Sequence, residues 1–105
     1  MTIVEEMEEI NEAIDSGGTV LLFFWREDQP DALDLFNKIK RLCRRFPPVQ
    51  AYGICLDEIP TAASRFNIFI SPAVLIYVHG RPRLKQVHAV HPQQVSDYLK
   101  SLYRR

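Results

Sequence analysis

The sequence lacks several features that mark whole classes of protein. Its 105 residues contain only two cysteines, Cys43 and Cys55, which are too far apart in the chain to form a Cys-x-x-Cys motif. Isolated thiols of this kind are typical of a reducing compartment, so we expect a cytoplasmic protein with both thiols free. An apolar run such as Ala73–Val78 is far too short to span a bilayer, and the acidic start Met1–Glu6 has no secretory signal.

An excess of charge of either sign is also missing. The chain has 13 basic and 13 acidic residues, which predicts neither nucleic acid nor a membrane surface as partner. Basic residues do cluster in Lys38–Arg45 and at Arg104–Arg105, and we interpret them as a solvated helix face and a solvated chain end. The length predicts a single domain over residues 1–105.

Hydrophobic periodicity and turn residues predict alternating helices and strands. Thr2 and Glu5 form a capping-box pattern, which predicts a helix from the start of the chain to the pair Gly17–Gly18. The later predictions are a strand at 20–25, a helix from 30 to 46, a strand at 49–56, a short helix at 57–65, strands at 72–78 and 84–90, and a helix from 92. This order predicts a mainly parallel sheet with helices on both faces and one antiparallel hairpin.

Short motifs along this pattern resemble the thioredoxin family in their order and spacing. They are Phe24-Trp25, Phe66-Asn67-Ile68, Ser71-Pro72-Ala73, His79-Gly80-Arg81 and Val87-His88-Ala89-Val90. The resemblance begins at about Val20 and covers most of the chain. It implies a thioredoxin-like three-layer α/β/α fold with a mixed central sheet of about four strands, because the family's first strand is missing from the predicted pattern.

The chain departs from the family where the redox chemistry takes place. Thioredoxins carry Cys-x-x-Cys at the turn before a helix, where the helix N-terminus activates the first thiol. The matching residues here are Gln29, Pro30, Asp31 and Ala32. Phe23 stands where the family buries an aspartate, and Gly53 stands at the position of that aspartate's lysine partner. With these parts of the mechanism replaced, we expect no catalytic residues and no dithiol oxidoreductase activity.

The resemblance also implies a peptide-binding groove, since thioredoxins bind an extended peptide through the backbone before a cis-proline. Phe69 and Ile70 indicate an apolar contact patch there, unless both pack under the neighbouring helix. His88 replaces a family glycine and either fills part of the groove or points to solvent. The predicted groove consists of Trp25, Gln29, Pro30, Asp31, Phe69, Ile70, Ser71, Pro72 and His88, with Pro72 as the cis-proline.

The leading hypothesis is therefore a redox-inactive module without a cofactor that binds a protein or peptide as a chaperone, adaptor or regulatory subunit. Self-association into a homodimer remains an open alternative for the partner.

Two other activities and a metal site are alternative interpretations of individual residues. The alternative function is a monothiol thiol–disulfide oxidoreductase using Cys43 or Cys55, although both fall on faces with a core pattern. A hydrolase built from Asp28, Asp31 and His88 has no recognisable constellation. We expect no metal site, because no cysteine or carboxylate stands at ligand spacing from the histidines, which are His79, His88 and His91.

Overall fold

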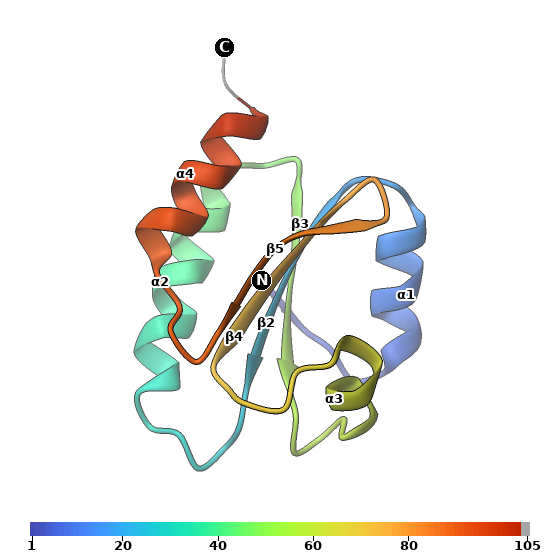
Figure 1. The fold of residues 1–105 in the computed structure, drawn as a ribbon, viewed down its shortest axis with the longest axis vertical. Helices are drawn as coiled ribbons and strands as arrows, with labels where there is room; N and C mark the ends of the chain where they lie inside the picture. The colour runs from blue at the N-terminus through green and yellow to red at the C-terminus, as the bar shows by residue number, and fades with distance from the viewer. Residues whose placement is uncertain (104–105) are drawn as a thin grey trace.

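A central five-stranded sheet carries helices on both faces (Figure 1). The structure is a computed structural model that describes residues 1–103, so the predicted solvated end at Arg104–Arg105 lies outside the described residues. The elements are β1 (Thr2–Ile3), α1 (Met7–Asp15), β2 (Thr19–Trp25), α2 (Ala32–Arg44), β3 (Val49–Cys55), α3 (Thr61–Phe66), β4 (Ala73–Val78), β5 (Arg81–Val87) and α4 (Pro92–Leu102). Across residues 1–103 there is no helix with the length and apolarity needed to cross a bilayer.

The strand order is β1-β3-β2-β4-β5, with β2 in the centre. β2 is parallel to β3 and antiparallel to β4, and β5 is antiparallel to β4 at one edge. Helices α1 and α3 cover one face, and α2 and α4 cover the other (Figure 1).

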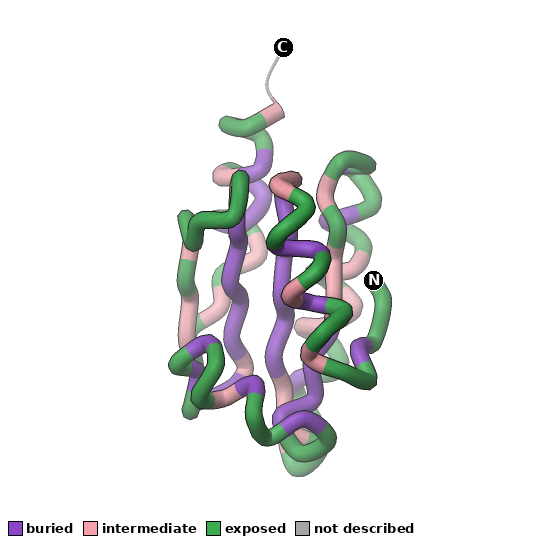
Figure 2. Tube along the Cα trace, turned by 90° about the vertical axis from the view of Figure 1, so that its right-hand side faces the viewer, coloured by how far each residue is buried: buried purple, intermediate pink, exposed green. Residues whose placement is uncertain are grey.

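The unbroken apolar run of β2 follows from this double covering. Leu22 and Phe24 belong to the core under α1 and α3, whereas Leu21 and Phe23 belong to the core under α2 and α4. Alternate side chains of a strand point to opposite faces, so a strand covered on both sides is apolar throughout. Figure 2 shows the resulting buried strands enclosed by helices with exposed outer faces.

The start of the chain corrects the sequence-based prediction. Thr2 is in a strand, β1, which pairs with β3, so the sheet has the first strand that was predicted to be missing. α1 begins only at Met7 and has no side-chain cap, so the capping box of Thr2 and Glu5 does not form. Pairing with the edge of β3 satisfies the backbone here, and the Val4 N–H donates to the Gly53 carbonyl at 2.9 Å. These distant contacts outweigh a short local motif.

Element boundaries also shift near the predicted groove. The short helix α3 begins at Thr61 instead of Asp57. The edge strand β5 spans Arg81–Val87, so His88 lies outside it with a positive φ of 68°. The His88 N–H donates to the Pro72 carbonyl at 2.8 Å, which connects the two loops.

Candidate functional site

Contacts with the segment that follows β3 stabilise the turn between β2 and α2. Arg26 and Asp57 form an ion pair at 3.6 Å, and the Glu27 N–H donates to the same carboxylate at 2.8 Å. The Leu56 N–H donates to the Trp25 carbonyl at 2.8 Å. These contacts carry the parallel pairing of β2 with β3 beyond the ends of the two strands.

Gln29 connects this turn to the loop before Pro72. Its Nε2 donates to the Ser71 carbonyl at 2.8 Å, and the Ser71 hydroxyl donates to its Oε1. The Arg26 N–H also donates to Oε1, at 3.3 Å. Ser71 is 5% exposed, and its peptide bond to Pro72 is cis. At the position that matches the family's first cysteine, the chain therefore carries an amide that hydrogen-bonds two neighbouring segments.

Aromatic packing occupies the space beneath the turn. The register of β2 and β3 places Phe23 opposite Gly53, the two positions that match the family's aspartate and lysine. Phe23 contacts the Trp25 and Phe36 rings, at centroid distances of 6.2 and 5.8 Å. A Cβ on Gly53 would lie 2.9 Å from the Trp25 ring and 3.1 Å from the Phe36 ring. Glycine at position 53 makes room for this cluster, and neither position supplies an ionisable group.

The loop before Pro72 presents apolar side chains to solvent. Phe69 is 60% exposed and Ile70 is 57% exposed, so the alternative that both pack under a helix is wrong. Their backbone N–H groups have no backbone acceptor among residues 1–103. The loop therefore combines free donors with exposed apolar groups, as strand addition requires.

A hollow of about 520 Å³, which the sequence pattern does not predict, lies on the α2 side of the turn. Ile3 and Leu33 line it and are 51% and 65% exposed. Trp25 and Phe36 contribute to its wall, as does Gln29. The sequence pattern predicts a helix at Ile3, where the structure has β1, and Leu33 lies outside the apolar face predicted for α2. A large apolar residue on the polar face of an amphipathic helix was the available signal for Leu33.

The remaining predicted polar residues do not converge. His79 lies in the β4–β5 turn, and its Nδ1 is 2.8 Å from the Gly17 carbonyl. His91 precedes α4, and His88 is exposed. No group of potential metal ligands is present in residues 1–103. Among these residues, no hydrogen bond joins Asp28, Asp31 and His88, the set considered for hydrolysis.

Both thiols are buried. Cys43 is 8% exposed in α2, and burial raises its pKa to about 11, against a smaller lowering by the N-terminal ammonium group. Cys55 is 4% exposed and pairs in register with Trp25 at the end of β3. Neither thiol belongs to the turn or to the loop before Pro72.

Sequence comparison finds a thioredoxin-like relative that matches part of the chain. No family model matches the chain. It is similar to the thioredoxin-like protein YdfQ of Bacillus subtilis (strain 168), with 32% identity over 60 residues; the match covers 57% of this chain but only 54% of that protein.

Solved structures match over nearly the whole chain. Thioredoxin O2 from Arabidopsis thaliana in the oxidised state matches with a TM-score of 0.86 and 18% identity, covering 98% of this chain and 94% of the other. Mitochondrial thioredoxin 3 from Saccharomyces cerevisiae matches with a TM-score of 0.85 and 16% identity, covering 96% and 94%. At such identities the likeness concerns the arrangement of the backbone.

Proposed function

Because this chain has a thioredoxin-like α/β/α fold, as expected from its sequence, and is similar to a thioredoxin-like protein over part of its length, we propose that it binds a protein or peptide partner and does not exchange thiols. The observation that carries the proposal is the pair of hydrogen bonds between Gln29 and Ser71. The residue at the first redox position is an amide, and its polar atoms are already engaged by the loop that faces it.

Thiol–disulfide exchange needs an accessible thiolate as nucleophile. Gln29 and Ala32 contain no sulfur, and Phe23 beneath them cannot accept or donate a proton. Burial and a pKa of about 11 keep Cys43 protonated at neutral pH. The two free thiols agree with our further proposal of a cytoplasmic location.

Binding through the same surface needs no sulfur. An extended peptide can pair with the free backbone donors of the loop at Phe69 and Ile70. The side chains of this pair offer apolar contacts on one side of the Gln29–Ser71 link. The hollow beside Leu33 offers room for an apolar side chain on the other. We therefore propose an extended segment with apolar side chains as the partner, which suits a chaperone, adaptor or regulatory role.

Selection of binders from a displayed peptide library, followed by truncation, tests the binding surface. Phe69→Ala and Ile70→Ala should weaken a selected peptide by roughly 1–2 kcal/mol, which is about 5- to 30-fold in Kd. Both variants should melt near the parent, because exposed side chains contribute little to the core. Leu102→Ala is the matched control, since Leu102 is an exposed apolar residue at the end of α4. Unchanged peptide affinity in both loop variants would contradict the proposed surface.

A reduction assay tests the absence of redox activity. The protein should not accelerate the reduction of insulin by dithiothreitol above the uncatalysed rate. Turnover above background that disappears in Cys55→Ser or in Cys43→Ser would instead establish the monothiol oxidoreductase.

A further inference from the structure

A second hollow, of about 330 Å³, lies between α2 and α4, and the proposed peptide surface does not include it. Lys38, Arg41 and Arg45 line it from α2 and the residue that caps this helix. Gln93 and Ser96 line it from α4. Residues spaced by three or four lie on one face of a helix, so the cations point into the same groove.

These cations have no acidic partner in the described part of the chain. Among residues 1–103, an ion pair forms between Arg26 and Asp57 alone, at the turn between β2 and α2. Asp34 precedes Lys38 by one helical turn without forming an ion pair with it.

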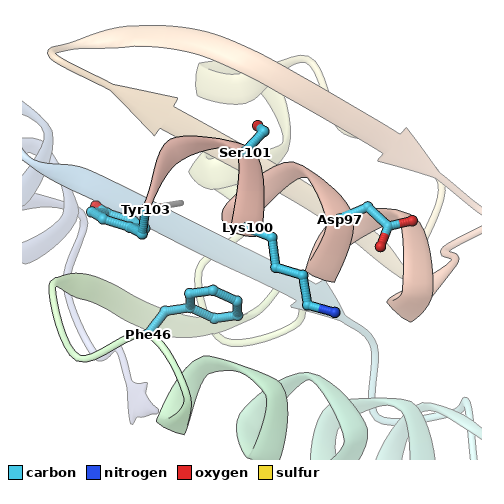
Figure 3. A pocket seen from close by; sticks show the side chains of 5 residues that line it. All are labelled: Phe46, Asp97, Lys100, Ser101 and Tyr103. Atoms are coloured by element: carbon cyan, nitrogen blue, oxygen red, sulfur yellow. The ribbon is translucent and has the colours of Figure 1, made fainter. Parts of the chain in front are cut away.

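Asp97 is the acidic residue of α4, and it does not line this hollow. Its carboxylate accepts from Gln93 Nε2 at 2.9 Å. It lines the neighbouring hollow of about 380 Å³, where Figure 3 shows it on the same helix as Lys100. The basic hollow itself therefore has an excess of positive charge.

Ser96 supplies an independent sign of a missing ligand. The residue is 3% exposed, and its hydroxyl is buried with no hydrogen-bond partner in the described structure. A buried hydroxyl without a partner destabilises the fold, so native proteins rarely leave one unpaired. Ser96 lines the hollow, and the first turn of α4 beside it has no side-chain cap at His91. Pro92 has no N–H, and the Gln94 N–H donates to the His91 carbonyl at 3.0 Å. Gln93 therefore carries the N–H of this turn that has no backbone acceptor among residues 1–103, and such a group at a helix N-terminus attracts anions.

We propose that this hollow binds a phosphate group, either as free phosphate or as the monoester of a small molecule. Guanidinium groups bind phosphate oxygens through paired, charge-assisted hydrogen bonds, and lysine adds a point charge. The Ser96 hydroxyl and the first turn of α4 would complete the shell on the opposite wall. The inference does not depend on the peptide-binding proposal, because no residue is shared between the two sites.

Interaction with the helix dipole does not account for the arrangement. Arg41 and Arg44 lie in the last turn of α2, where cations stabilise the helix end. Lys38 lies further from that end, however, and Ser96 belongs to the other helix. Arg44 shares the helix end but does not line the hollow, which makes it a matched control for Arg45.

Titration followed by backbone amide NMR tests the proposal. Inorganic phosphate and glycerol 3-phosphate would be added at neutral pH, with sodium chloride holding the ionic strength constant. We expect saturable shifts centred on the amides of Gln93 and Ser96. Equal affinity for the two ligands would mean that the phosphate group alone is recognised, and tighter binding of glycerol 3-phosphate would indicate a small-molecule monoester.

The variants separate a site from general attraction to a basic surface. Arg41→Gln and Arg45→Gln should each weaken binding about fivefold or more, since each removes a charge-assisted contact. Ser96→Ala should also weaken binding while leaving the protein as stable as the parent or more so. Arg44→Gln should bind like the parent, although it loses the same charge. Shifts that do not saturate, equal losses in Arg44→Gln and Arg45→Gln, or unchanged binding in Ser96→Ala would overturn the site.

Discussion

Replacing Gln29 by alanine removes the link between the turn and the loop before Pro72. The side chain accepts from the Ser71 hydroxyl, donates to the Ser71 carbonyl at 2.8 Å and accepts from the Arg26 N–H at 3.3 Å. Ser71 is 5% exposed, so its hydroxyl loses its partner in a place that water reaches poorly. The Arg26 N–H lies nearer to solvent and can exchange its long hydrogen bond for one to water.

The magnitude follows from these contacts. A typical hydrogen bond contributes roughly 0.5–1.5 kcal/mol net, and a buried polar group left without a partner costs about 1–3 kcal/mol. We expect Gln29→Ala to lose about 2 kcal/mol of unfolding free energy, with most of the loss at Ser71. For a domain of this size, that corresponds to a decrease of roughly 8–16 °C in Tm.

Urea denaturation and a double-mutant cycle measure the link directly. Gln29→Ala, Ser71→Ala and the double variant should give a coupling free energy of about 1 kcal/mol or more, with unchanged m-values. Gln94→Ala is the control, because Gln94 is exposed and its side chain makes one hydrogen bond, to Gln86. Its effect should stay within about 0.5 kcal/mol.

Two results would contradict a stabilising link between Gln29 and Ser71. If Gln29→Ala and Gln94→Ala were equally stable, the amide would contribute no more than an ordinary surface residue. If the effects of Gln29→Ala and Ser71→Ala simply added, each side chain would act on its surroundings separately, and the turn and loop would not be joined through them.

Three further predictions concern the turn, the aromatic cluster beneath it and the buried thiol of α2. Gly53→Ala should lower the unfolding free energy by roughly 1–3 kcal/mol in urea denaturation, because the new methyl group overpacks the Trp25 and Phe36 rings. Gly18→Ala should lower it less, because the nearest atom there is a side-chain nitrogen 3.4 Å away. Equal losses in the two variants would contradict crowding at Gly53. Burial raises the Cys43 pKa from 9.0 to about 11, so the thiol loses its proton at lower pH in the unfolded state than in the folded state. The contribution of this thiol to the unfolding free energy should be complete below pH 9 and should fall as the pH rises toward about 11. Cys43→Ala should flatten the plot of unfolding free energy against pH in this range. Gln29→Cys combined with Ala32→Cys should form a reversible disulfide under mild oxidation, detected by thiol counting, without thioredoxin-like turnover; failure to form the bridge would contradict the alignment of this turn with the redox motif.

Short-range patterns determined much of the backbone. The apolar run at 20–25 can be buried on both faces only in the middle of a covered sheet, and β2 occupies that place. The helix ended by Pro47–Pro48 and the helix begun at Pro92 were likewise predicted from their local stop and start signals. These features depend on neighbouring residues, so a single sequence is enough to predict them.

The start of the chain shows where such patterns fail. Thr2 and Glu5 favour a cap by their spacing, but β3 lies close enough to pair with residues 2–3. A backbone that finds partners on a distant strand adopts their conformation, because leaving that edge unpaired costs more than losing a local cap.

At the site, the residue types alone exclude certain groups: there is no thiol at Gln29 or Ala32, and no ionisable group at Phe23. The contacts made by the replacing side chains depend on how distant segments pack together. Gln29 and Ser71 are 42 positions apart, and the hydrogen bonds between them depend on β2 and β4 pairing side by side. The exposure of Phe69 and Ile70 likewise depends on where the neighbouring helix lies in the fold. Periodicity records which face of an element is apolar, whereas a binding surface depends on which distant faces the fold leaves uncovered.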